Sequence, residues 1–175
     1  MGKVIRHQKN FIHSEPATIL NQKGIKTPMH QEKTLLSSKF ASNQVYSNQD
    51  ITRVFLTSPQ GGMRRSKRTN SLVLIAKIST NSGDNPYEDR WQNDGYFHYT
   101  GMGRIGDQSL DYMQNRTLTE SETNHVNIYL FESSHANEYR YCGEVRLAAL
   151  PYAVQETDAT GKLRRVYKFP LAIKQ

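Results

Sequence analysis

The 175-residue sequence has a single cysteine, Cys142, and no long hydrophobic run. One thiol excludes an internal disulfide and a cysteine-rich zinc site, and such low cysteine usage is typical of a reducing compartment. No apolar stretch approaches the roughly 20 residues that a membrane-spanning helix needs, and the N-terminus lacks the apolar core of a signal peptide. These absences predict a cytoplasmic protein.

Recognisable catalytic patterns are also missing. The six histidines form no HxxxH or HExxH pair, and the sequence holds neither a GxSxG nucleophile motif nor a phosphate-binding P-loop. Residues 101–106 do fit the letters GxGxxG, but no βαβ unit surrounds them, so they do not predict a dinucleotide site. We therefore expect no cofactor, no metal and no catalytic residue in this chain alone.

The charge is unbalanced, because 23 Lys and Arg against 16 Asp and Glu give a formal net charge of +7. A basic chain favours a polyanionic partner, with nucleic acid first and an anionic membrane second. Two basic runs stand out, one before an apolar strand pattern and one at the start of the last strand pattern. The candidate contacts to a nucleic-acid backbone are Arg64, Arg65, Lys67, Arg68, Arg104, Lys162, Arg164 and Arg165.

The hydrophobic pattern divides the chain into an arm and a domain. Residues 1–44 are polar and lack a sustained period, which predicts a loosely ordered or accessory arm. In the domain, residues 45–175, a helix is expected at 48–56, with Ser47 as its N-cap. Strands are expected within 71–79, 96–100, 125–133, 139–150 and 164–173. Because strands predominate without βαβ spacing, we expect an α+β fold: a small, curled, antiparallel-rich barrel with one to three short helices.

The stretch YEDRWQNDGYFHYTGMGRIGDQ, residues 87–108, combines aromatic rings, carboxylates and glycines. A nucleobase offers two π faces and a hydrogen-bonding edge, so a site for one needs rings, an acceptor and open backbone. Tyr87 and Tyr99 are the candidate stacking rings, and Asp89 is the candidate acceptor. The expected base pocket is Tyr87, Asp89, Trp91, Tyr99, Thr100 and Gly101, in which Trp91 supports the loop by packing.

Two other functions remain open from the residues. Glu88, Asp89 and Asp107 could bind a metal ion, which would make the chain a nuclease or a base hydrolase. A small basic barrel could also bind RNA.

The order of short motifs resembles that of the SRA (SET- and RING-associated, or YDG) domains of the PUA-like superfamily, over residues 72–171. The motifs are SLVLIA, YEDRW, YFHYTGMG, GDQSL, NRTLTES, VNIYLF, YRYCGEVRL and YKFPL. Twelve residues separate Tyr87 from Tyr99, as in the family's two tyrosines that sandwich a flipped base. The chain looks closest to the SRA-like domains of bacterial modification-dependent endonucleases, which an HNH nuclease commonly follows.

The resemblance implies a module that binds double-stranded DNA with a modified cytosine, 5-methyl or 5-hydroxymethyl, by flipping the base into an aromatic pocket. It implies a bacterial restriction system in which the nuclease is fused or separate, so that this chain is not itself an enzyme. Three features depart from the family. The YDG motif becomes Tyr141-Cys142-Gly143, Arg90 stands where the family has its pocket aspartate, and the Asn-Lys-Arg finger has no match.

Overall fold

The computed structural model describes residues 18–20, 26–28, 36, 38–78, 89–158 and 160–175. Most of the expected arm, together with Tyr87 and Glu88, lies outside the described residues. The strands are β1 (Thr18–Leu20), β2 (Lys26–Pro28), β3 (Val45–Tyr46), β4 (Met63–Ser66), β5 (Ser71–Lys77), β6 (Arg90–Trp91), β7 (Phe97–Thr100), β8 (Asn127–His135), β9 (Glu138–Leu147), β10 (Tyr152–Thr157) and β11 (Leu163–Ile173). The helices are α2 (Asn48–Phe55), α3 (Met113–Thr119) and α4 (Ser121–Asn124).

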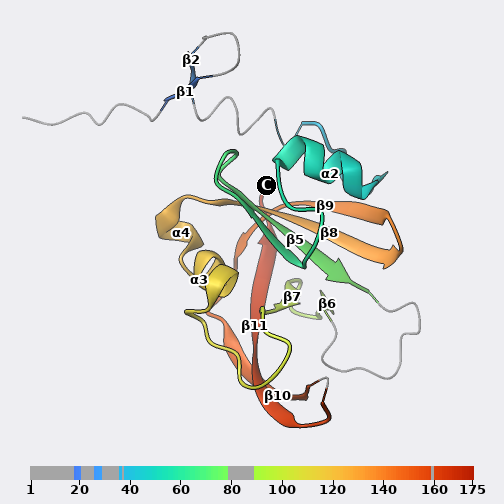
Figure 1. Ribbon diagram of the computed structural model, residues 1–175, viewed down its shortest axis with the longest axis vertical. Coiled ribbons are helices and arrows are strands. Elements are labelled where there is room, and N and C mark those ends of the chain that lie inside the picture. The colour runs from blue at the N-terminus through green and yellow to red at the C-terminus, as the bar shows by residue number, and fades with distance from the viewer. Residues whose placement is uncertain (1–17, 21–25, 29–35, 37, 79–88, 159) are drawn as a thin grey trace, which may run out of the picture.

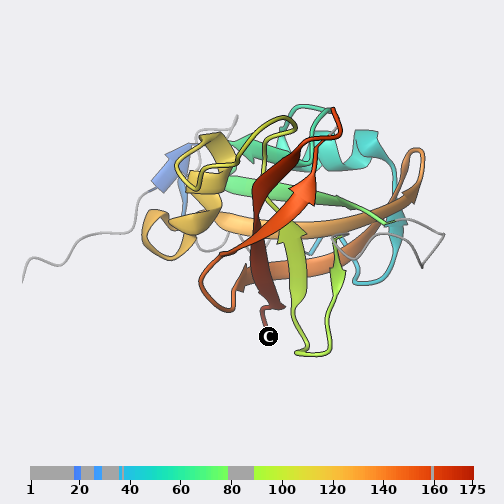
Figure 2. The ribbon, with the colours of Figure 1, turned by 90° about the horizontal axis from the view of Figure 1, so that it is seen from below.

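The main sheet has nine strands and follows the order β4-β5-β8-β9-β11-β7-β6, with β10 added beside β11 and β3 beside β9. The β5–β8 pair is parallel, and the other pairs described in this sheet are antiparallel. The strands curl around one another (Figure 2). The expected curled, antiparallel-rich sheet with short helices is therefore confirmed. It is open, since the described residues contain no pairing between β4 and β6.

Strand β5 is buried on both faces, which explains its continuous apolar run. Leu72, Leu74 and Ala76 join the inner core. Val73 and Ile75 join a second cluster on the opposite face, because successive side chains of a strand alternate. This double burial requires a covering element on each side of the sheet.

Helix α2 is the cover of the second face and lies over the upper end of the sheet (Figure 1). It begins with the expected capping box, in which Ser47 and Asp50 bond each other's backbone N–H, and so the expected helix is confirmed. Its buried residues Ile51 and Phe55 pack on the sheet, with the Phe55 ring 4.7 Å from that of Tyr129.

The opposite end of the molecule is built from the β10–β11 hairpin and the segment that follows β7 (Figure 1). Helices α3 and α4 flank this segment and return the chain to β8. None of the described helices is both long and apolar enough to cross a membrane.

Candidate nucleic-acid interface

Strand β7 carries side chains of opposite character on its two faces. Phe97 and Tyr99 belong to the inner core. Thr100 pairs in register with Lys168 of β11, and by strand alternation both side chains lie on the other face. That face is polar although it is largely buried, and such a surface needs internal partners.

Asp89 is the acceptor at the centre of this polar face. Its Oδ1 accepts a hydrogen bond of 2.6 Å from the Thr100 backbone N–H. Burial raises the pKa of the Asp89 carboxyl to about 6, although hydrogen bonds from Thr100 and the charge of Lys168 act in the opposite direction. A carboxylate has about four lone-pair positions, so the bond from the Thr100 backbone leaves capacity for another donor.

A row of buried charges continues from Asp89 along the β10–β11 hairpin. The Lys168 Nζ donates to Thr100 Oγ1 and lies 3.9 Å from Glu156 Oε2. Glu156 Oε1 lies 3.4 Å from a terminal nitrogen of Arg164, which is also buried. The row alternates in sign, and the described residues leave Glu156 Oε2 and Arg164 Nε without a hydrogen bond.

The glycine loop that follows β7, residues 101–107, is held by two buried amides. Gln108 Nε2 donates to the carbonyls of Gly101 and Gly103, and its Oε1 accepts from the Tyr167 N–H. Asn115 exchanges two hydrogen bonds with the backbone of Met102. A Cβ at position 101 would lie 2.8 Å from Gln108 Oε1, which explains the glycine. The sequence motifs contained both amides, but their role as loop supports was not predicted.

The same loop rests on the β10–β11 turn and exposes its own tip. The Gly106 N–H donates to Asp158 at 3.2 Å, and Arg164 donates to the Gly103 carbonyl. Ile105 is 69% exposed, and Leu163 of the adjoining strand is 71% exposed. The tip of the loop is therefore accessible to a ligand.

The structure describes two of the three expected pocket aromatics, Tyr99 and Trp91. Tyr87 lies outside the described residues. Tyr99 differs from the expected open ring, because it is 3% exposed and its hydroxyl donates to the Gly62 carbonyl at 2.8 Å. Trp91 is 41% exposed and packs edge-on against Phe97, with ring centroids 5.4 Å apart. Asp89 is bonded to Thr100 at the end of β7, directly before Gly101.

The expected backbone contacts fall into two classes. Arg64 and Arg164 are buried, and Arg64 donates to Asn48 Oδ1 and the Gly61 carbonyl. These two guanidinium groups serve the fold, because burial withholds them from a phosphate in this conformation. Arg65, partly buried, donates to three backbone or side-chain oxygens of its own hairpin.

The exposed cations also occupy two separate places. Arg104 and Lys162 are exposed beside the glycine loop, and Arg165 there is 3.5 Å from Asp107. Lys67 and Arg68 are exposed in the β4–β5 turn, which Asn70 ties to the C-cap of α4 through a bond to the His125 carbonyl. The candidate backbone contacts therefore do not form one continuous basic stripe.

The two described carboxylates of the proposed metal site, Asp89 and Asp107, are each engaged with a different part of the backbone. Asp107 accepts from the Arg165 backbone N–H at 2.7 Å, while Asp89 is bonded to Thr100. Over the described part of the chain, no three His, Cys, Asp or Glu side chains gather as a metal site.

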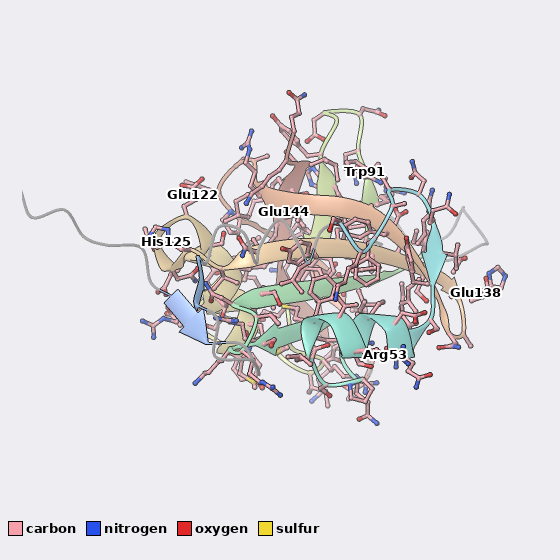
Figure 3. All side chains as sticks on the ribbon, turned by 90° about the horizontal axis from the view of Figure 1, so that it is seen from above. Arg53, Trp91, Glu122, His125, Glu138 and Glu144 are labelled. Carbon is pink, nitrogen blue, oxygen red and sulfur yellow. The ribbon has the colours of Figure 1, made fainter. Side chains whose placement is uncertain are left out.

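A cavity of about 320 Å³ lies elsewhere, between α4 and the ends of β8, β9 and β11. Glu122 and His125 of its lining lie at one end of the molecule in Figure 3, far from Glu138 at the other. Trp91, beside the candidate interface, lies at the side opposite Arg53 of α2 (Figure 3). The cavity is thus distinct from the polar face of β7.

One family model matches most of the chain. The profile of the ScoMcrA-like SRA domain matches residues 42–174. The sulfur-binding and SRA domains of ScoMcrA, complexed with phosphorothioated DNA, superpose with a TM-score of 0.59 at 16% identity, over 76% of this chain and 39% of that one. No curated protein sequence matches.

Two further solved structures share the fold. The DNA modification-dependent restriction endonuclease AspBHI has a TM-score of 0.56 at 20% identity, over 77% of this chain and 42% of that one. The SUVH5 SRA domain, in complex with hemi-methylated CG DNA, has a TM-score of 0.51 at 20% identity, over 77% and 88%. The chain thus spans about two fifths of the ScoMcrA and AspBHI chains and most of the SUVH5 domain.

Proposed function

The chain belongs to the family of ScoMcrA-like SRA domains, and from that membership we propose that it binds double-stranded DNA at a modified cytosine, 5-methyl or 5-hydroxymethyl. The observation that carries the proposal is the position of Asp89, bonded to Thr100 at the end of β7. An acceptor in that place suits the exocyclic amine of a cytosine. The related structures with phosphorothioated and with methylated DNA support a modified duplex as the ligand.

The mechanism is base flipping. A base inside a duplex does not expose its edge to Asp89, so it leaves the stack at a cost of a few kcal/mol, which new contacts offset. Asp89 accepts from the amine, and the Thr100–Gly101 backbone meets the edge of the ring. Tyr87 provides one stacking ring in this proposal, and each such stack contributes roughly 1–3 kcal/mol.

Phosphate contacts come from the cations that the fold leaves exposed. Arg104 and Lys162 lie beside the glycine loop, and Ile105 at the tip of that loop is directed to solvent. Cations in this position hold the backbone on either side of the flipped nucleotide, which sets register without reading sequence. Arg64 and Arg164 have no part in this, because both are buried.

The domain acts as the recognition module of a modification-dependent restriction system, and a fused or separate nuclease performs the cleavage. Residues 1–44 form an accessory arm to a DNA-binding domain of residues 45–175. The family match over residues 42–174 and the likeness to two restriction endonucleases support this assignment. No catalytic role is proposed for Asp89 or Asp107.

The test is a binding panel of duplexes that differ at one cytosine. Fluorescence anisotropy would compare the affinities for DNA duplexes that carry cytosine, 5-methylcytosine or 5-hydroxymethylcytosine at this position. A duplex with plain cytosine and a phosphorothioated backbone, and an RNA duplex, would be measured in the same way. We expect the tightest binding to one of the two modified cytosines, and a loss of that preference in Asp89→Ala. Equal affinity for all five ligands would contradict the proposal. Tighter binding of the RNA duplex than of any DNA duplex would show that the chain binds RNA instead.

A further inference from the structure

Lys168, in the middle of β11, is a lysine inside the protein, with a side chain only 5% exposed. Its pairing partners are Thr100 on β7 and Tyr152 on β10. A buried ammonium is unfavourable unless charges and hydrogen bonds replace its water. Lys168 has such partners, since its Nζ donates to Thr100 Oγ1 and lies 3.9 Å from Glu156 Oε2.

The bond to Thr100 sets the direction of a hydroxyl. An ammonium has three donors and no acceptor, so Thr100 Oγ1 accepts from Lys168 and keeps its own hydrogen for another group. The nearby acceptor is Asp89, whose Oδ1 already takes the Thr100 backbone N–H at 2.6 Å and whose pKa the Thr100 side chain lowers. Lys168 thereby acts on Asp89 through its charge and through the oriented hydroxyl.

We propose that Lys168 is the positioning residue that keeps Asp89 an acceptor, and that it thereby makes the pocket select a base with an exocyclic amine over one with a carbonyl at the same position. This inference rests on the proposed function. An ionised carboxylate only accepts, whereas a protonated one also donates and can bond a carbonyl.

Thymine is the competitor that makes this selection necessary. It carries a 5-methyl group as 5-methylcytosine does, but it presents a carbonyl where cytosine presents an amine. A thymine in a T·G mismatch is also flipped at lower cost than a paired base. A pocket that sensed only the methyl group would therefore accept it, and the state of Asp89 is what excludes it.

The charges around Asp89 determine how it responds to loss of Lys168. On the elements packed together here, the other titratable or charged groups are Arg164 of β11, Glu156 of β10, Arg90 of β6 and Tyr99 of β7, together with His98 of β7 and Tyr152 of β10, which share a hydrogen bond of 2.6 Å. Burial raises the pKa of Asp89, the Thr100 hydroxyl and Lys168 lower it, and Glu156 raises it further. Removing Lys168 takes a positive charge away from Asp89 and leaves Glu156 paired with Arg164 alone among the described cations, so protonated Asp89 persists to higher pH.

The first experiment needs no DNA. The Asp89 carboxyl is titrated by ¹³C NMR in the wild-type chain, in Lys168→Met and in Lys168→Arg. We expect a wild-type midpoint of about 6, a Lys168→Met midpoint higher by about one pH unit, and a Lys168→Arg midpoint near that of the wild type. The matched control is Lys174→Met, which removes another partly buried lysine, paired at 2.7 Å with Glu144.

If Lys168→Met does not fold, Thr100→Val takes its place, because it removes the hydroxyl and retains both charges. An unchanged midpoint in whichever variant folds overturns the inference, as does an equal rise in Lys174→Met.

The second experiment measures the selection itself, as the ratio of Kd values for duplexes with T·G and with 5-methylcytosine·G at one site. The wild type should favour 5-methylcytosine, and Lys168→Met should reduce this ratio about tenfold near pH 7. The ratio of Lys168→Met should recover at higher pH, and Lys168→Arg should keep the wild-type ratio. An undiminished ratio in Lys168→Met overturns the inference.

The two experiments separate the possible failures. Suppose that the Asp89 midpoint shifts but the protein does not distinguish 5-methylcytosine from cytosine. The proposed function and the selection would then be refuted, while the effect of Lys168 on the pKa of Asp89 would stand. An unshifted midpoint in a protein that does distinguish them would refute the role of Lys168 and leave the proposed function.

Discussion

Replacing Asp89 by Asn should make the free protein more stable at neutral pH, although the same residue is needed for the proposed recognition. Burial raises the pKa of Asp89 from 3.8 to about 6 on folding. Between those values the folded state binds more protons than the unfolded state, so stability falls as the pH rises from about 4 to about 6. At about 1.4 kcal/mol for each tenfold change in an ionisation constant, the ionised form costs roughly 3 kcal/mol above pH 6.

Asparagine removes this cost but not all the contacts. Its amide oxygen can accept the Thr100 N–H bond, now 2.6 Å to Asp89. Lys168 loses the negative charge of Asp89, and that of Glu156 at 3.9 Å remains. Since a buried cation with fewer partners is destabilising, we expect the net gain of Asp89→Asn to be about 1–2 kcal/mol near pH 7.

The assay is urea unfolding of wild type and Asp89→Asn at about pH 4 and about pH 7.5. The variant should be more stable only at the higher pH. Asp158→Asn is the control of opposite sign, because a bond from the Thr160 hydroxyl and several backbone N–H bonds hold the pKa of Asp158 well below its usual range. It should lose stability at both pH values of the assay, because the contribution of Asp158 disappears only when the pH falls through its lowered pKa, below the acid arm. An Asp89→Asn chain that is less stable than wild type near pH 7.5 would refute the reasoning.

Three further predictions concern the loop, the core and the exposed cations. Arg104→Ala with Lys162→Ala should weaken binding to modified and plain duplexes equally and flatten its salt dependence in anisotropy titrations, because each phosphate contact releases counterions. Gly101→Ala should cost roughly 1–3 kcal/mol in urea unfolding, because its Cβ would lie 2.8 Å from a buried glutamine oxygen. Tyr99→Phe should cost about 1 kcal/mol and leave base preference intact, because its hydroxyl bonds the Gly62 carbonyl.

Each of these has a contrary outcome. Arg64→Ala is the control for the cations: it should lower stability and leave the salt slope unchanged, and the reverse result would return Arg64 to the interface. A Gly101→Ala chain as stable as wild type would show that Gln108 can move aside. Loss of base preference in a stable Tyr99→Phe protein would give the hydroxyl a part in recognition. Tyr99→Ala is less informative, since its cavity should cost about 3–5 kcal/mol.

Much of the fold follows from local patterns in the sequence. The capping box at Ser47 begins α2 where expected, and the apolar run at residues 71–77 is a strand buried on both faces. These predictions succeed because the capping bonds are made within four residues and because period and hydrophobicity report burial directly. The order of motifs likewise indicated the SRA family, which the match over residues 42–174 shows.

The environment of each polar residue was less predictable. Arg64 and Arg164 read as surface cations beside basic neighbours, yet both are buried. Lys168 and Glu156 were not singled out, although an isolated lysine in the apolar segment VYKFPL was a signal that it needed a partner. Tyr99 was expected to be an open ring, and its strand instead turns it into the core.

The sequence by itself determined the strand segments of β5, β7, β8, β9 and β11, where α2 begins, and that the residues around YTGMG belong to an SRA-type domain. Only the tertiary structure decided which charges are available to a ligand. The reason is that a buried charge is tolerated only with partners, and these come from distant parts of the chain. Arg164 reaches the Gly103 carbonyl across 61 positions, and Lys168 reaches Thr100 across 68. No local pattern encodes such pairs, because the register between β7, β10 and β11 is set by the sheet as a whole.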